Sequence, residues 1–243
     1  MAEQEQLLNL VRQHEELWEW IRKLDAGSGT YSEVSKIAEL LADRIAEVTG
    51  RHYSEDELIG FLRAGHEIIS DAGEVAQRNL NDAAGIGLNP LRRKFPEAKA
   101  SELVRDLSVV EPEMVASELA RSVPTLMLSM VDDIVEYNRD FQAKAGLKPI
   151  IVRTWSGSYP SHDTKHTDWC HRLAGTYEYG TEPPEVYARH KGCRCRVEYF
   201  PSARAKGRIT ALAKGDTDRD SVLWNTRQET LKKRLTKAKR NNE

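Results

Sequence analysis

The hydrophobic period of this chain changes once, at residue 150, and this change divides the sequence into two regions of different secondary structure. Over residues 3–146, apolar side chains recur every three or four positions, which is the period of an α-helix with one buried face. From Ile150 onward, short β-branched and aromatic runs replace that spacing. The pattern predicts an α+β fold, mainly α, in which a long helical N-terminal region precedes a small sheet.

Caps and glycines mark the helix boundaries in the first region. We expect one helix to begin at an N-cap, Ser32, and to end at Gly50, and a second helix to open with a capping box formed by Ser54 and Glu57. Glycine is unfavourable inside a helix. The second helix is therefore expected to be bent, broken or closely packed against another backbone at its three glycines, which are Gly60, Gly65 and Gly73.

A third, longer helix is predicted to start near Pro112, since proline suits the first turn of a helix. Pro124 is expected to kink this helix, because an interior proline removes a hydrogen bond. Gly146 and Pro149 should end it. Its apolar stripe runs from Val115 to Phe141, and we consider it a surface that could dock on a partner.

In the second region, two predicted strands flank a segment rich in cysteine and histidine. The strands cover residues 150–155 and 196–200, with a short helix at 169–173 between them. The segment from His162 to Cys195 holds all three cysteines and four of the seven histidines of the chain. So small a unit buries little apolar area and commonly needs a metal or a larger body to pack on. We expect a two- or three-stranded Cys/His knuckle.

Thiolate and imidazole are the ligand pair that zinc prefers in closed tetrahedral sites. The sequence therefore predicts a structural Zn²⁺ ion held by four of five candidates. The spacing decides little by itself, because the C-x-x-C knuckle of many zinc motifs does not occur here. The candidate ligands are His166, Cys170, His190, Cys193 and Cys195.

Two interpretations without a metal stay open for this cluster. The cysteines could be small buried hydrophobic residues in a packed, metal-free knuckle. Two of them could form a disulfide, but Cys193 and Cys195 cannot both bond Cys170, so one thiol would be left over. An odd, low cysteine count without an N-terminal secretory signal favours a reducing compartment, where such clusters are more often metal sites. His162 and His171 are expected at the surface.

Charge is distributed unevenly along the chain. Residues 202–243 contain 12 Lys and Arg against 5 Asp and Glu, whereas residues 1–201 contain 24 against 33. A basic tail on an acidic body suggests a nucleic acid or an acidic protein surface as partner, although a solvated helix face has the same composition. A short helix is expected at residues 227–239. No run approaches the ~20 apolar residues that a membrane helix needs, so we expect no membrane partner.

These signals divide the chain into three parts. Residues 1–148 are predicted to form a helical assembly domain, residues 149–201 the Cys/His knuckle domain, and residues 202–243 a basic tail with a short helix. No part carries a complete catalytic motif. The deaminase pattern needs H-x-E with a downstream P-C-x-x-C, and only His14-Glu15-Glu16 matches its first half. His66-Glu67 lacks the second histidine of H-E-x-x-H, so we expect that the protein is not an enzyme.

Three runs in the second region carry a family resemblance. They are Val152-Arg-Thr, then D-W-C-H-R-L-A-G-T-Y-E-Y, then V-Y-A-R-H-K-G-C-R-C-R-V-E-Y-F-P. The order of these runs, their spacing and the positions of their aromatic residues resemble the C-terminal signature of the minor head proteins of tailed bacteriophages. This is the head-morphogenesis family named after the F protein of phage Mu. The resemblance covers about residues 150–201. Relatives usually carry further cysteines a few positions before the one matching Cys170, where this chain has His166 and Thr167. In a zinc site of this family, His166 would replace a thiolate, which zinc tolerates.

The resemblance implies a structural virion protein without catalysis that acts in head morphogenesis. Its expected partners are the phage portal and the major capsid protein, with packaged DNA as a contact of the basic tail. The expected location is the phage head, where the protein would be oligomeric, and the host cytoplasm during assembly. Two alternatives remain, a zinc-dependent enzyme that modifies nucleic acid and a DNA-binding accessory factor that reads no sequence.

Overall fold

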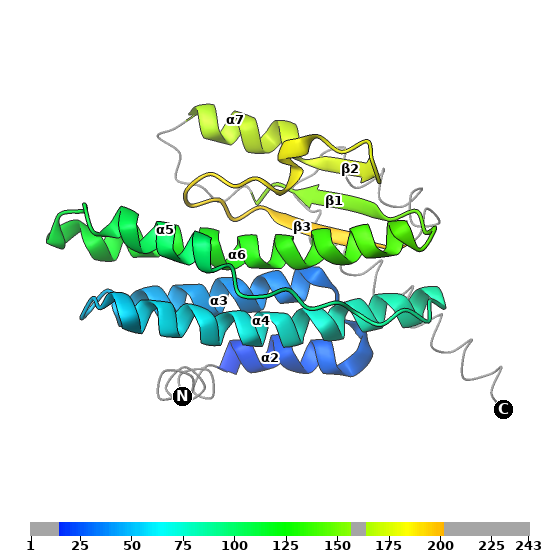
Figure 1. The fold of residues 1–243 in the computed structure, drawn as a ribbon, viewed down its shortest axis with the longest axis horizontal. Helices are drawn as coiled ribbons and strands as arrows, with labels where there is room; N and C mark the ends of the chain where they lie inside the picture. Colours follow the sequence, from blue (N-terminus) through cyan, green and yellow to red (C-terminus); the bar gives the residue numbers. More distant parts are fainter. Residues whose placement is uncertain (1–14, 157–163, 202–243) are drawn as a thin grey trace.

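Long helices form the body of the molecule, and a small sheet covers one side of it (Figure 1). The computed structural model describes residues 15–156 and 164–201, without the side chains of Ser28 and of residues 164–168. His162, the side chain of His166 and the basic tail lie outside the described part. The architecture is the mainly helical α+β fold that the sequence predicts.

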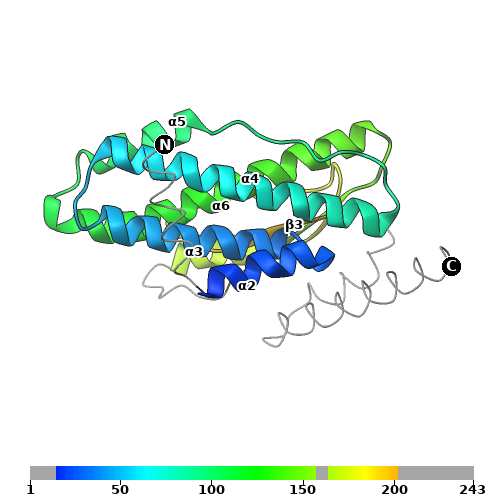
Figure 2. The ribbon, with the colours of Figure 1, turned by 90° about the horizontal axis from the view of Figure 1, so that it is seen from below.

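The body consists of α2 (Glu15–Lys23), a π-helical turn η1 (Leu24–Ser28), α3 (Tyr31–Thr49), α4 (Glu55–Ala84), α5 (Glu97–Leu107) and α6 (Pro112–Lys144). The second region consists of β1 (Ile150–Thr154), α7 (Thr164–Leu173), β2 (Gly175–Glu178), a 3-10 turn η2 (Pro184–Tyr187) and β3 (Arg196–Phe200). Seen from below, α3, α4 and α6 run side by side along the length of the molecule (Figure 2).

The N-cap of α3 is Thr30, so the prediction of Ser32 was wrong by two residues. The Thr30 hydroxyl accepts a hydrogen bond from the backbone N–H of Ser32, and the Glu33 carboxylate accepts one from the backbone N–H of Thr30. This reciprocal pair is a capping box, which Ser32 cannot form because it has no acidic residue three positions later. Thr30 and Glu33 are both buried, so the cap belongs to the core.

The glycines of α4 allow close packing against α6. The helix runs unbroken over 30 residues. A Cβ at Gly65 would lie 2.5 Å from Cε of Met127, and one at Gly73 would lie 3.2 Å from Cγ2 of Ile134. The helix is therefore not broken, and at these two positions it packs closely against side chains of α6 rather than against another backbone as predicted. Ser54 is the N-cap of α4, but its side chain makes no cap hydrogen bond, so the predicted capping box with Glu57 was wrong.

Helix α6 is the central element, and it continues through Pro124 for 33 residues. Its predicted end is confirmed, because Gly146 adopts a φ of 86° and the N–H of Leu147 donates to the Gln142 carbonyl at 3.0 Å. The apolar stripe of α6 packs inside the protein's own core, so it cannot serve as the docking surface we expected. Its buried members are Leu119, Val123, Leu126, Met130 and Ile134.

The sheet has three antiparallel strands in the order β2-β1-β3. Strand β1 pairs Ile151 with Tyr199 and Arg153 with Val197 of β3. Because side chains alternate between the two faces of a strand, these four residues share one face. Ile151, Val197 and Tyr199 belong to the same hydrophobic core as the helices. The sheet is thus packed on the body, with α7 beyond the strands (Figure 1).

A chain of buried hydrogen bonds also joins the helices to the sheet. The Tyr31 hydroxyl donates to Gln77 at 2.9 Å, and the Gln77 amide donates to Asn81 at 2.9 Å. Gln142 of α6 donates to the same Asn81 oxygen at 2.6 Å and accepts from the Tyr199 hydroxyl of β3. Each of these polar groups therefore has a partner in the interior, where an unpaired group would be costly. Among the described helices, none is long and apolar enough to cross a membrane.

Replacing Thr30 with Ala is expected to lower the free energy of unfolding by about 1–2 kcal/mol, because the cap of α3 loses its acceptor. Replacing Ser32 with Ala is the matched control, and we expect a change below about 0.5 kcal/mol. Urea denaturation of both variants measures the difference. Equal losses in the two variants would contradict the assignment of the cap.

Candidate metal centre

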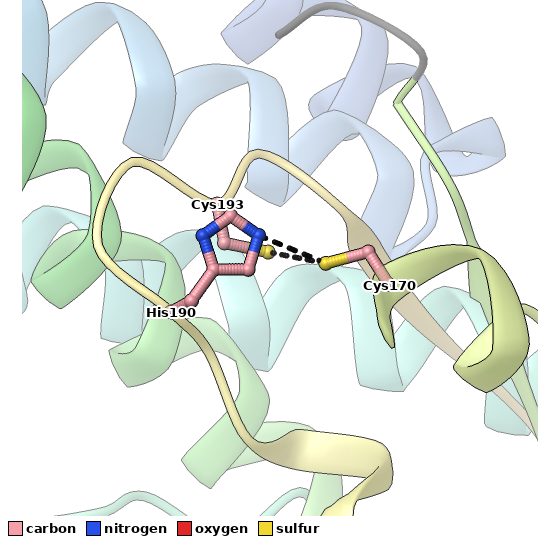
Figure 3. Close-up of side chains that lie close together, drawn as sticks. All are labelled: Cys170, His190 and Cys193. Atoms are coloured by element: carbon pink, nitrogen blue, oxygen red, sulfur yellow. Dashed lines mark hydrogen bonds between the residues drawn. The ribbon is translucent and has the colours of Figure 1, made fainter. Parts of the chain in front are cut away.

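Three of the five predicted ligands converge between α7 and the loop before β3 (Figure 3). Cys170 comes from the last turns of α7, and His190 and Cys193 come from the loop. The Cys170 sulfur lies 3.0 Å from Nε2 of His190 and 3.7 Å from the Cys193 sulfur. All three ligand atoms lie within 4.8 Å of one another. This group can hold a metal ion.

The imidazole of His190 is oriented as a metal ligand. Its Nδ1 lies 2.9 Å from the backbone carbonyl of Lys191. A carbonyl oxygen only accepts, so Nδ1 carries the proton and Nε2 directs its lone pair at Cys170. Histidines that bind metals almost always donate their other ring N–H to a carbonyl or carboxylate in this way. The Trp169 ring packs edge-on against the imidazole, with the centroids 6.1 Å apart.

The remaining candidates differ in how the structure places them. Cys195 is 2% exposed and packs in one cluster with Cys170, Cys193 and Trp169, although its sulfur is outside the group of three mutually close ligand atoms. His166 stands one helical turn before Cys170 on α7, and its side chain lies outside the described residues. All three cysteines are free, so no disulfide forms among them.

His171, expected at the surface, is exposed. Its ring packs edge-on against Trp155 at a centroid distance of 5.3 Å. This contact is separate from the cysteine cluster, so His171 provides a control for the candidate ligands.

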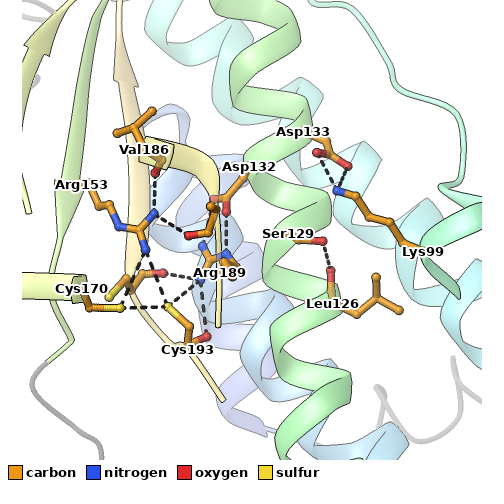
Figure 4. A network of polar contacts seen from close by, with 12 residues as sticks. Lys99, Leu126, Ser129, Asp132, Asp133, Arg153, Cys170, Val186, Arg189 and Cys193 are labelled. Atoms are coloured by element: carbon orange, nitrogen blue, oxygen red, sulfur yellow. Dashed lines mark hydrogen bonds and ion pairs between the residues drawn. The ribbon is translucent and has the colours of Figure 1, made fainter. Parts of the chain in front are cut away.

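A buried ion pair fixes the ligand loop to α6 (Figure 4). The guanidinium of Arg189 donates from Nε and Nη2 to the two carboxylate oxygens of Asp132, at 2.5 and 2.9 Å. Both side chains are 2% exposed. Nη1 of Arg189 donates to the carbonyl of Cys195 at 2.7 Å. One side chain therefore holds the helix and the backbone of the ligand loop together.

Three further contacts hold the same loop. The backbone N–H of Gly192 donates to the Thr125 hydroxyl of α6 at 2.7 Å. Gly192 has a φ of 78°, a conformation that residues with a side chain rarely adopt. Lys191 pairs with Glu118 of α6, and Arg194 pairs with Asp43 of α3 at 2.7 Å. The loop is thus attached to two helices on both sides of Cys193.

Positive charge surrounds the sulfur atoms. Nη2 of Arg153 lies 4.0 Å from the Cys170 sulfur and 3.8 Å from that of Cys193, and Nη1 of Arg189 lies 3.9 Å from Cys193. Hydrogen bonds from the Cys170 and Cys195 thiols, together with the charge of Arg189, hold the pKa of Cys193 well below its usual value. The hydrogen bonds with Cys193 and Cys195 raise the pKa of Cys170. The cluster therefore favours a thiolate at Cys193, the form that binds metals.

In the Asp132–Arg189 pair, burial and the attraction between the two charges shift each pKa in opposite directions. Burial raises the pKa of the Asp132 carboxyl, and the charge of Arg189 opposes that rise. Burial alone would lower the pKa of Arg189, but Asp132 raises it above its ordinary value. Breaking a buried pair by removing one partner costs much more than the pair contributes, because the other charge remains buried.

Sequence reasoning assigned no role to Arg153, Arg189, Asp132 or Thr125. A signal was present for two of them. Asp132 follows Val131 and stands three residues before Val135 in the apolar pattern of α6, and Arg153 follows three apolar residues in β1. Charged residues within apolar runs are rarely fully buried unless they are paired. The sequence could therefore have identified Asp132 and Arg153 as candidate buried charges. It could not have identified the residues that contact them.

The thiols of the cluster are shielded from solvent, whereas His190 is half-buried. Cys170, Cys193 and Cys195 are each at most 2% exposed. Structural metal sites are closed by protein ligands, whereas catalytic sites keep one position open to water or substrate. Comparison with protein-family models, curated proteins and solved structures gave no match.

Replacing Asp132 with Asn is expected to lower the free energy of unfolding by about 3–5 kcal/mol, because Arg189 would remain buried without a counter-ion. Replacing the neighbouring Asp133 with Asn is the matched control. Asp133 pairs with Lys99 at 2.7 Å near the surface, and such a pair contributes about 1 kcal/mol or less. Denaturant unfolding compares the two variants. A similar, small loss in both would contradict the role of the buried pair.

Proposed function

We propose that the protein is a structural component of a tailed-phage head, a minor head protein in which a zinc ion locks the C-terminal region onto the helical body. One observation carries the proposal. The cluster of Cys170, His190 and Cys193 lies within residues 150–201, the stretch that resembles the head-morphogenesis family. The surrounding loop is attached to α6 by contacts suited to holding a structure rather than to turning over a substrate.

The donor set and its distances fit zinc. With Zn–S near 2.3 Å and Zn–N near 2.0–2.1 Å, a tetrahedral site places two sulfurs about 3.8 Å apart and a sulfur and a nitrogen about 3.6 Å apart. The two sulfurs of Cys170 and Cys193 are 3.7 Å apart. The 3.0 Å between Cys170 and His190 is shorter, so the imidazole would move outward by roughly half an ångström. Bound zinc would cross-link α7 to the ligand loop.

The burial of the thiols favours this role over that of a zinc enzyme. A catalytic zinc ion needs an open position for water or substrate, and all three thiols are buried. The DNA-binding alternative depends on residues 202–243, which lie outside the described residues. In the proposed function, that tail contacts packaged DNA.

A contact with the portal or the major capsid protein must use a surface other than the buried stripe of α6. The connection between α5 and α6 and the first turn of α6 each expose one large apolar side chain, Val109 at 83% and Met114 at 54%. Exposed apolar groups that lie close together often mark protein contacts. We propose this turn as the contact with the head.

Protein purified without added metal is expected to contain close to one zinc ion per chain, measured by elemental analysis. Replacing Cys193 with Ser should remove most of the zinc, because it deletes a thiolate of the cluster. Replacing His171 with Ala is the control and should leave the zinc content unchanged. Wild-type protein with less than a tenth of an equivalent would contradict a zinc site and leave a packed, metal-free knuckle.

Purified procapsids or virions are expected to contain the protein, and a pull-down from infected cells should recover the portal or the major capsid protein. A double variant, Val109→Asp with Met114→Asp, should recover less of either, because charge at the turn opposes burial in an interface. Its unfolding curve is the control for folding. If virions and procapsids both lack the wild-type protein, the proposed function is wrong.

A further inference from the structure

Arg153 is a buried cation without a carboxylate partner among the described residues. It lies on the middle strand, and its side chain is 2% exposed. Nη1 donates to the backbone carbonyls of Val186 and Ala188, and Nη2 faces the sulfurs of Cys170 and Cys193. No described carboxylate forms an ion pair with it, as Asp132 does with Arg189.

A buried charge needs compensation by an opposite charge. The carbonyl dipoles of Val186 and Ala188 and the face of the Trp169 ring, 5.5 Å away, reduce the cost of burying Arg153 but supply no net negative charge. Among the described residues, the sulfur atoms are the remaining groups in contact with its guanidinium. Negative charge on the sulfur cluster would therefore balance Arg153.

The charges around the cluster indicate how many thiolates bind the metal. Arg153 and Arg189 bring two positive charges, and Asp132 brings one negative charge (Figure 4). A zinc ion with two thiolates and two imidazoles is neutral, so one positive charge would stay unbalanced. With three thiolates and one imidazole, the metal complex carries one negative charge, and the charges of the metal complex, Arg153, Arg189 and Asp132 sum to zero.

We propose that the metal ligands are Cys170, His190, Cys193 and Cys195, and that Arg153 is a positioning residue whose charge balances this three-thiolate site. His166 is then not a ligand. The inference depends on the proposed metal-binding role and goes further by selecting four of the five candidates. Cys195 already packs against the other two cysteines, which supports the selection.

The ligand set is tested by loading the full-length protein with Co²⁺, whose thiolate-to-metal absorbance rises with the number of bound sulfurs. Replacing Cys195 with Ser should lower this absorbance per bound metal by about a third, as one of three thiolates is lost. Replacing His166 with Ala should leave both the absorbance and the metal stoichiometry unchanged, as should the control His171→Ala.

Loss of metal in His166→Ala, with Cys195→Ser unchanged, would overturn the proposed set. If Cys195→Ser does not fold, the wild-type absorbance and the metal content of His166→Ala decide: absorbance of three thiolates with unchanged metal content supports the set, and absorbance of two thiolates or loss of metal overturns it. Wild-type protein that binds neither Zn²⁺ nor Co²⁺ would instead refute the metal role itself. The two failures are therefore distinguishable.

The role of Arg153 is tested by competition for zinc with a chelator. Replacing Arg153 with Met keeps a long side chain but removes the charge, and we expect zinc affinity to fall 10–100-fold, the usual effect of losing a partner behind the metal ligands. Replacing Arg153 with Lys restores the charge and should recover most of the affinity. Equal affinity in the wild type and the Met variant would overturn the role, and so would an equal loss in the Met and Lys variants.

Discussion

The ion pair between Arg189 and Asp132 is the interaction on which the candidate metal centre depends. Both side chains are buried at 2% exposure, and they join the middle of α6 to the residue that precedes His190. Because the same guanidinium also binds the Cys195 carbonyl, the helix and both ends of the ligand loop share one anchor. The loop could not keep its thiols close to α7 if this anchor were lost, since a charge left alone in the interior would draw in water.

Charge links this anchor to the sulfur atoms. Arg153 approaches the cluster from the sheet and Arg189 approaches it from the loop, so the thiols lie between two cations. Such an environment stabilises thiolates, and thiolates bind a metal ion. The ion pair, the second arginine and the proposed metal therefore form one electrostatic unit. Its charges are mutually compensating, although each of them alone would be costly to bury.

Helix α6 gives the site its rigid support, and this role limits what else the helix can do. Its apolar stripe packs against the other helices, while Asp132, Thr125 and Glu118 hold the ligand loop on another face. The hydrogen-bonded chain that reaches Tyr199 through Gln142 then ties the sheet to the same helix. With both sides of α6 occupied inside the protein, the proposed contact with the head is left to peripheral surfaces such as the turn between α5 and α6.

The sequence by itself determined the features that depend on neighbours along the chain. The helical period, the end of α6 at Gly146, the strands β1 and β3 and the Cys/His cluster follow from local spacing and backbone preference. The tertiary structure decided which charges are buried and which residues meet. Asp132 and Arg189 lie 57 positions apart, and no local pattern specifies their pairing. The same holds for the close packing at Gly65, because it depends on elements brought together only by the folded path of the chain. The cap at Thr30, in contrast, was readable from the local spacing of Thr30 and Glu33.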